Sequence, residues 1–304
     1  MPELPDVVVY VERLRATFVG ATLETVRIRS PSLLRTAEPP LATAFGRQVV
    51  GFERLGKRIV TELQGELFLV LHLMIAGRLK LRPRGAPLPG KLGMAAFDFD
   101  RGGLLLTEAS SHKRTQLFVV QGRAGLDAHD PGGIEVLECS LDAFRDALTR
   151  ESHTIKRTLT DPHLISGIGN AYSDEILHRA RLSPVKLSPK LTVDEIERLF
   201  ESCRSVLVEW TERLRAHTGD GWPDKVTAFR PEMAVHGRYG KPCPVCGTKV
   251  QRIVYAKNET NYCPTCQTEG RLLSDRALSR LLHQDWPRTL SELEERMERQ
   301  RAKR

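Results

Sequence analysis

Four cysteines arranged in two close pairs constrain the fold of this chain more than any other feature. Cys243 and Cys246 form one Cys-x-x-Cys pair, Cys263 and Cys266 form the other, and sixteen residues separate them. Two such pairs can bring four thiolates into the tetrahedral arrangement that Zn²⁺ prefers, and four sulfur ligands leave no open position for water. The pattern therefore predicts one structural Zn²⁺, in preference to a redox pair or disulfides.

The residues between the two cysteine pairs predict a β-hairpin. Residues 249–256 and 259–262 read as its strands, with the tip at Lys257 and Asn258. Residues 236–282 contain eight basic and three acidic side chains. A basic zinc hairpin favours a grip on DNA, although zinc ribbons also occur in unrelated proteins.

The charge and composition of the whole chain point to the same class of partner. The formal net charge is +8, which favours a polyanion and most often a nucleic acid. The start of the chain lacks the basic segment and apolar core of a signal peptide, and no apolar run approaches 18 residues. We therefore expect a soluble protein of a reducing compartment, with no membrane partner.

The first residues carry a candidate nucleophile. The chain begins Met1-Pro2-Glu3, and removal of Met1 would expose Pro2 as a secondary amine. Amines that attack carbonyl carbons form Schiff bases, and an α-amino group titrates near pH 8, so roughly a tenth of it is neutral at pH 7. The alternative is that Pro2 only governs the removal of Met1.

The N-terminal part reads as a β-sandwich or barrel preceded by a helix. Asp6 is expected to cap that helix and Gly20 to end it. Short strands with glycine turns then follow to about residue 121, and Lys57 lies at one of these turns, where a solvated lysine is the ordinary case. The predicted strands cover 22–28, 58–63, 67–73, 79–82 and 117–120.

After about residue 140 the apolar pattern becomes helical. Thr192–Glu195 is a capping box that opens a long amphipathic helix. Upstream, two glycines precede Asn170, which is expected to cap another helix whose free N–H groups could bind phosphate. With Lys156 one helix earlier, this suggests a helix–turn–helix variant that contacts the DNA backbone, although a plain interhelical turn would give the same pattern.

Together these landmarks resemble the formamidopyrimidine-DNA glycosylase/endonuclease VIII family. The resemblance runs from Pro2 to Cys266 and comprises the Pro-Glu-Leu-Pro start, the turn lysine, the Gly-Ile-Gly-Asn turn and the four-cysteine hairpin. The start is closer to the formamidopyrimidine branch. The resemblance implies an α+β multidomain fold: an N-terminal β-sandwich with an N-terminal helix, a helical helix–two-turn–helix domain and a zinc hairpin.

The same resemblance implies a bifunctional DNA glycosylase and AP lyase of base-excision repair. Pro2 would form the Schiff base, Glu3 would act as the acid, and Lys57 would pair with a phosphate or with Glu3. The substrate would be an oxidised base of the 8-oxoguanine or formamidopyrimidine type in double-stranded DNA. The expected DNA contacts are His72, Ile75, Lys113, Arg114, Lys156, Asn170, Lys257 and Asn258.

The surface that probes the lesion departs from the family pattern. The family's His-Leu-Gly-Met-Ser-Gly run is here 72–77, with Ile75 where the gap-filling methionine would lie. The expected Arg-Arg-Phe-Gly loop falls near 111–117, where the aromatic wedge is missing. Asn258 replaces the arginine of the hairpin tip, and Asp6 replaces a glutamate.

These observations predict four parts and a monomer that acts in the cytoplasm at the nucleoid. The parts are a catalytic β-sandwich (1–135), a helical DNA-binding domain (136–235), a zinc finger (236–270) and a helical extension (271–304), which includes helices near 278–282 and after a capping box at 289–292. Two alternatives are a non-catalytic damaged-DNA-binding protein on the same scaffold and an unrelated zinc-ribbon factor.

Overall fold

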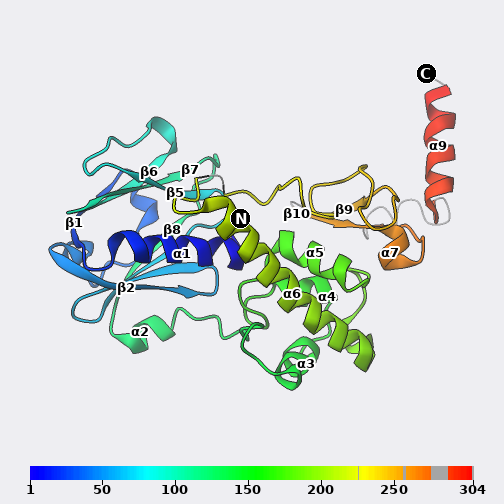
Figure 1. The fold of residues 1–304 in the computed structure, drawn as a ribbon, viewed down its shortest axis with the longest axis horizontal. Helices are drawn as coiled ribbons and strands as arrows, with labels where there is room; N and C mark the ends of the chain where they lie inside the picture. Colours follow the sequence, from blue (N-terminus) through cyan, green and yellow to red (C-terminus); the bar gives the residue numbers. More distant parts are fainter. Residues whose placement is uncertain (225, 256–257, 275–286, 303–304) are drawn as a thin grey trace. The chain divides into compact units, whose positions relative to one another are not determined.

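The computed structural model describes residues 1–224, 226–255, 258–274 and 287–302, and its elements are labelled in Figure 1. Contacts divide the chain into two compact units. Unit 1 comprises Met1–Gly133 and Leu207–Ala228, and unit 2 comprises Ile134–Val206 and Phe229–Arg304. The division into four parts stays a prediction.

Unit 1 is built on one antiparallel sheet of eight strands in the order β5-β7-β6-β1-β2-β3-β4-β8. Only two residue pairs, Thr22↔Gln48 and Leu23↔Arg47, join β1 to β2, so the sheet consists of two four-stranded halves. The strands are β1 (Thr22–Ile28), β2 (Arg47–Leu55), β3 (Arg58–Leu63), β4 (Leu67–His72), β5 (Gly77–Arg82), β6 (Gly93–Phe99), β7 (Gly102–Glu108) and β8 (Gln116–Gln121).

The two halves of the sheet share a single apolar core. Ile59 and Leu71 from one half belong to the same cluster of buried side chains as Phe97 and Leu104 from the other. Alternate residues of a strand point to opposite faces, so each half contributes its inward face to this core. The predicted β-sandwich is therefore confirmed, as one sheet folded into two packed layers.

Helix α1 (Leu4–Phe18) packs into this core through one face. Val7, Val11, Leu14 and Phe18 are buried, at the spacing that places residues on one side of a helix. The expected cap is wrong by one turn: Glu3 is the N-cap residue, and Asp6 lies in the first turn. The helix thus begins earlier than expected and includes a proline in its first turn, where the missing N–H would have no helical partner in any case.

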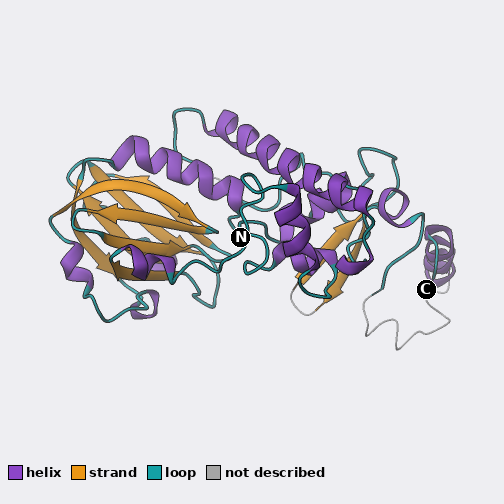
Figure 2. Ribbon diagram, turned by 90° about the horizontal axis from the view of Figure 1, so that it is seen from below, coloured by secondary structure: helices purple, strands orange, loops and turns teal. Residues whose placement is uncertain are grey.

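Unit 2 is mostly helical, as Figure 2 shows, with a small two-stranded sheet. The predicted capping box of α6 is confirmed, since Thr192 and Glu195 exchange side-chain to backbone hydrogen bonds of 2.9 and 3.3 Å. The α-helices among the described residues of this unit are α3 (Leu141–Thr149), α4 (Ile155–Thr160), α5 (Asn170–Arg179), α7 (Pro264–Thr268) and α9 (Leu290–Ala302), while α6 (Val193–Thr218) continues into unit 1.

The predicted hairpin is present between the two cysteine pairs. Its strands are β9 (Gln251–Tyr255) and β10 (Asn258–Tyr262), which pair antiparallel. Lys257, at the expected tip, lies outside the described residues, as does the helix expected near 278–282. The segment after α7 contacts the hairpin, because the N–H of Leu273 donates to the Tyr262 hydroxyl at 2.7 Å.

The capping box expected at the start of the last helix is present in half. The N–H of Glu292 donates to the Thr289 hydroxyl at 3.3 Å. The Glu292 carboxylate accepts instead from the N–H of Arg288, at 2.7 Å. Helix α9 therefore begins close to the predicted position, with the reciprocal bond displaced by one residue.

Candidate nucleic-acid and catalytic site

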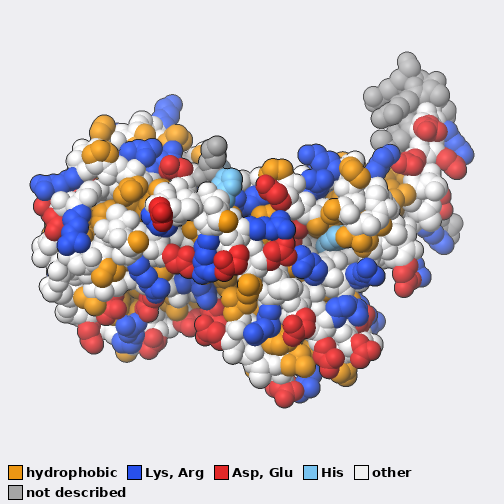
Figure 3. Space-filling view, in the orientation of Figure 1, with side chains coloured by type: hydrophobic (Ala, Val, Ile, Leu, Met, Phe, Trp, Pro, Cys, Tyr) orange, Lys and Arg blue, Asp and Glu red, His pale blue; other side chains and the backbone are white. Residues whose placement is uncertain are grey.

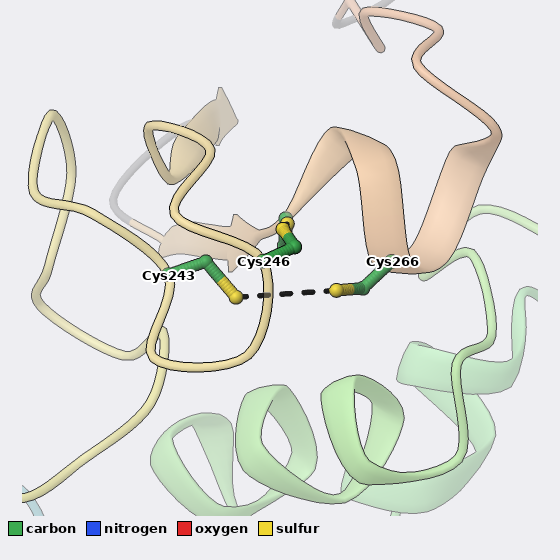
Figure 4. A group of neighbouring side chains, drawn as sticks. Cys243, Cys246 and Cys266 are labelled. Atoms are coloured by element: carbon green, nitrogen blue, oxygen red, sulfur yellow. Dashed lines mark hydrogen bonds between the residues drawn. The ribbon is translucent and has the colours of Figure 1, made fainter.

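The four cysteine side chains of unit 2 converge on one point. Their sulfur atoms all lie within 4.8 Å of one another. Cys243 and Cys266 are 3.9 Å apart (Figure 4), and Cys246 and Cys263 are 3.4 Å apart. Zinc–sulfur bonds of about 2.3 Å in a tetrahedron require sulfur separations of roughly 3.8 Å. The donor set and its dimensions therefore fit a structural Zn²⁺.

Local structure brings these four sulfurs together from two turns. The N–H of Gly247 donates to the carbonyl of Cys243 at 2.9 Å, which closes the first turn. Cys263 is the residue before α7, and its N–H donates to the Gln267 side chain at 2.8 Å. His178 of α5 adds an Nε2 atom 3.3 Å from the Cys243 sulfur, so the cluster is tied to the helical part of unit 2.

The start of the chain is buried in unit 1. Pro2 is buried, and Glu3 is 1% exposed. In the chain that retains Met1, burial lowers the pKa of the Met1 amine, the Glu3 carboxylate opposes this shift, and the positive charges of Arg78 and Lys57 add to it. An amine in this environment is neutral over a wider pH range than a solvated one.

Lys57 belongs to the same electrostatic environment. It lies in the turn between β2 and β3, next to Gly56, whose φ of 59° is a conformation that glycine adopts without strain. Burial lowers the pKa of the Lys57 ammonium, and the Glu3 carboxylate opposes that shift. Glu3 thus acts electrostatically on both the Met1 amine and Lys57, and a catalytic role for Pro2, Glu3 and Lys57 stays a prediction.

His72 and Ile75 lie at the end of β4 and in the turn that follows it. His72 pairs with Arg58 across β3 and β4, and burial, followed by the charges of Arg58 and Lys57, lowers the pKa of its imidazole to about 4. The imidazole is therefore neutral near pH 7. The Ile75 side chain is 55% exposed, which suits a residue that inserts into a base stack.

The turn around Ile75 has an unusual backbone. Met74 adopts φ of 51°, the left-handed region that costs a residue with a side chain roughly 1 kcal/mol or more. At Gly77 a Cβ atom would lie 2.4 Å from the Leu73 carbonyl oxygen, so glycine is required there by close approach. The turn is closed by the N–H of Gly77, which donates to that same carbonyl at 2.9 Å.

Lys113 and Arg114 lie on a loop that is anchored by Glu108. The Glu108 carboxylate, 1% exposed, accepts hydrogen bonds of 3.0 and 3.1 Å from the backbone N–H groups of Arg114 and Thr115. The Lys113 ammonium donates to the Glu108 carbonyl, whereas the Arg114 side chain is exposed. Sequence reasoning missed Glu108, because nothing in its local pattern distinguishes it from any strand end.

In unit 2, Asn170 and Lys156 are close together. Gly169, whose backbone is extended, is the N-cap residue of α5, so the cap prediction was wrong: Asn170 is already the first residue of the helix. Its amide nitrogen donates to the Glu259 carbonyl in β10 at 2.8 Å. The Lys156 ammonium donates to the Asn170 carbonyl at 3.0 Å. Asn258 belongs to β10, and Lys257 lies outside the described residues.

Sequence reasoning also missed Arg78 and a buried cluster around Asp174. Arg78 donates to the carbonyl of Val226 at 2.6 Å, and Asp174 binds His236 from 62 residues away. Contacts at such separation leave no local signal in a sequence.

Within the described residues no helix is long and apolar enough to cross a membrane. On the face shown in Figure 3, basic and acidic side chains are interspersed.

Three family models match the chain in succession. Residues 1–116 match the formamidopyrimidine-DNA glycosylase N-terminal domain, and residues 133–218 match the formamidopyrimidine-DNA glycosylase H2TH domain. Residues 240–268 match a zinc finger found in FPG and IleRS. The third match includes all four cysteines of the cluster.

Curated relatives of full length are also found. The chain is 34% identical over 279 residues to a formamidopyrimidine-DNA glycosylase of Thermus thermophilus, covering 89% of this chain and all of the relative. It is 33% identical to the formamidopyrimidine-DNA glycosylase of Heliobacterium modesticaldum, covering 88% of this chain and 100% of the relative. An uncharacterized formamidopyrimidine-DNA glycosylase-like protein of Mycobacterium tuberculosis is 42% identical over 150 residues, covering 49% of this chain and 93% of the relative.

Solved structures resemble this one over the same length. The crystal structure of the MutM (Fpg) protein of Thermus thermophilus has a TM-score of 0.73 at 33% identity, covering 88% of this chain and 98% of that chain. Lactococcus lactis Fpg, solved in complex with DNA that contains an abasic site, has a TM-score of 0.78 at 25% identity, covering 88% of this chain and 99% of that chain.

Proposed function

Because the chain belongs to the formamidopyrimidine-DNA glycosylase family and is a DNA glycosylase of that family, we propose that it excises oxidised bases and then cuts the strand. The preferred substrates would be 8-oxoguanine or formamidopyrimidine lesions in double-stranded DNA. Its structural neighbours include a MutM protein in complex with DNA containing carbocyclic 8-oxo-G, which supports this substrate class. The enzyme would act as a monomer on the DNA of the nucleoid.

The chemistry begins with a base that is flipped out of the duplex, which exposes the sugar carbon C1′. After removal of Met1, the neutral Pro2 nitrogen attacks C1′, while Glu3 protonates the ring oxygen as the sugar opens. The bond from C1′ to the base breaks, the base leaves with the electron pair of that bond and takes up a proton, and an iminium forms between Pro2 and C1′.

Strand cleavage follows from the same iminium. Its positive charge acidifies the hydrogens on C2′, so loss of one proton expels the 3′ phosphate by β-elimination, and a second elimination expels the 5′ phosphate. Hydrolysis of the remaining iminium returns the free Pro2 amine. Lys57 would keep the site positive and hold either a phosphate or the Glu3 carboxylate during these steps.

One observation carries this proposal: Pro2 and Glu3 are buried in unit 1, and the Glu3 carboxylate acts electrostatically on both the Met1 amine and the half-buried Lys57. Once Met1 is removed, burial and the nearby cations would favour a neutral Pro2 amine, and the adjacent carboxyl would supply a proton. Binding alone would require none of these. This favours an enzyme over the alternative, a non-catalytic damaged-DNA-binding protein.

The DNA-binding part of the proposal rests on side chains from both units. Ile75 would fill the space left by the flipped base, and neutral His72 would donate a hydrogen bond to a phosphate oxygen. Lys113 and Arg114 would contact the strand near the opposite base. In unit 2, Asn170, Lys257 and Asn258 would bind phosphates; the sequence also suggested Lys156, whose ammonium donates to Asn170, Ser173 and Asp174 within the protein.

The direct test is a panel of duplexes that contain 8-oxoguanine, formamidopyrimidine, oxidised pyrimidines or a preformed abasic site, each incubated with the protein and borohydride. The proposal predicts base release from at least one purine lesion and a covalent adduct with the abasic duplex. Glu3→Gln should lose base release far more than cleavage at the abasic site. Binding to damaged duplexes without release, cleavage or adduct would establish the binding-protein alternative.

A further inference from the structure

Asp174 of α5 is a buried carboxylate on which three separate segments converge. It is 1% exposed. One oxygen accepts from the Lys156 ammonium of α4, and the other accepts from His236 Nδ1 at 2.8 Å and from the N–H of Asn261 in β10 at 3.1 Å. A carboxylate this deeply buried is tolerated only when it is paired and hydrogen-bonded, so these contacts depend on one another.

The Lys156 ammonium is fully occupied by its neighbours. It donates to the Asn170 carbonyl at 3.0 Å, to the Ser173 hydroxyl at 3.0 Å and to the Asp174 carboxylate. An ammonium group has three hydrogens. Its side chain is also only 12% exposed. These contacts argue against the sequence-based expectation that Lys156 reaches a DNA phosphate.

Asn170 provides a second connection between helix α5 and strand β10 of the zinc hairpin. Its amide nitrogen donates to the Glu259 carbonyl of β10 at 2.8 Å. The amide group carries two hydrogens, so one bond to the hairpin orients the group and a second hydrogen is available for a phosphate oxygen. The direction of that second hydrogen therefore depends on where β10 lies, and Asp174 holds β10 at Asn261.

We propose that Asp174 is a positioning residue for DNA binding, which fixes Asn170 and the zinc hairpin in one arrangement. In this arrangement Lys156 stabilises the protein from within and does not contact DNA. His236 completes the connection: its ring stacks on Phe229 with centroids 5.6 Å apart, and Phe229 is 71% exposed. This inference rests on the proposed function only in taking duplex DNA as the ligand.

The test compares Asp174→Asn, Lys156→Met and the double variant in the full-length zinc-loaded protein. An exposed lysine of unit 2, Lys190, provides the control variant Lys190→Met. The affinity for a duplex with a non-cleavable abasic-site analogue is measured as a function of salt, with thermal stability recorded alongside. Hydrogen exchange of residues 258–262 reports on the hairpin directly.

Asp174→Asn and Lys156→Met should each bind the duplex at least tenfold more weakly, with an unchanged slope of log affinity against log salt, whereas the control Lys190→Met should bind as tightly as wild type. The double variant should bind better than Asp174→Asn alone, because it leaves no buried ammonium without its partner. Faster exchange at 258–262 should accompany the loss. If Asp174→Asn does not fold, Lys156→Met with Asp174→Leu supplies an apolar pair for the same comparison.

Two results would overturn the proposal. A slope reduced by about 0.9 in Lys156→Met would mark Lys156 as a phosphate ligand. A loss of thermal stability in Asp174→Asn with unchanged affinity would mark Asp174 as merely structural. Failure of the proposed function is separate: the wild-type protein would bind or trap no damaged duplex, while hydrogen exchange would still report whether Asp174 holds the hairpin.

Discussion

The backbone N–H of Glu3 donates to the carboxylate of Asp6 at 3.0 Å. Both residues are buried, and the bond satisfies one of the N–H groups that the start of α1 would leave without a partner. It also fixes the backbone of the proposed acid, one residue from the proposed nucleophile. The family resemblance predicts a glutamate at position 6, and the shorter Asp6 side chain reaches this N–H.

We expect Asp6→Ala to destabilise unit 1 by about 1 kcal/mol, the usual effect of losing a helix-capping side chain. Base excision should slow as well, because Glu3 would no longer be held in place. Chemical denaturation and single-turnover kinetics measure the two effects. Asp6→Glu restores a carboxylate and should recover most of both; an Ala variant as stable and as fast as wild type would show that the bond has no role.

Met74 offers a test of backbone strain. Its φ of 51° favours glycine, so Met74→Gly should be more stable than Met74→Ala by about 1 kcal/mol, because only the glycine relieves the left-handed conformation. Both variants remove the side chain, which makes them a matched pair in denaturant unfolding. Equal stability of the two variants would contradict the conformation of this turn.

The low pKa of His72 predicts a pH-dependent stability. Burial, with Arg58 and Lys57, lowers the pKa from 6.5 to about 4, so between these values the unfolded chain binds more protons than the folded one. Stability should therefore fall as the pH falls from about 6.5 to 4, by at most about 1.4 kcal/mol per pH unit from one group.

Replacing His72 with glutamine should remove that part of the pH dependence. The measurement is the free energy of unfolding of both proteins from about pH 4.5 to 7.5, a range that covers most of the interval between the unfolded and folded pKa values of His72. His217→Gln, at an exposed position of α6, is the control and should leave the curve unchanged. An identical pH dependence in wild type and His72→Gln would show that the imidazole is not shielded in unit 1.

The sequence allowed Pro2, Glu3 and Lys57 to be proposed as the catalytic residues of unit 1, because they lie in short local motifs; their roles stay predictions. It also predicted the four-cysteine cluster and most strands. The caps of α1 and α5 were misplaced because both helices begin earlier than expected: Asp6 lies in the first turn of α1, where it bonds to the Glu3 N–H, and Asn170 is the first residue of α5. Asp174 and Glu108 could not be found, because their partners are set by the fold.

Removal of the metal should affect DNA binding through the hairpin. We expect about one Zn²⁺ per chain, and either chelation or Cys263→Ser should weaken duplex binding at least tenfold by unfolding residues 243–266. Cys139→Ser, outside the cluster, is the matched control and should change neither zinc content nor affinity. Natively purified protein without zinc, or unchanged affinity after Cys263→Ser, would exclude a structural role for the metal.

The most direct test of the proposed mechanism is the identity of the nucleophile. Protein with a free Pro2 should form a borohydride-stable adduct with an abasic-site duplex, and the modified peptide should begin at Pro2. Its trapping rate should rise with pH to a midpoint below that of an ordinary terminal amine, near 8, because Pro2 is buried and burial favours the neutral form of an amine. The matched protein that retains Met1 should bind the duplex but neither cleave nor trap it. Equal trapping by the two proteins, with the adduct elsewhere in the chain, would contradict the account.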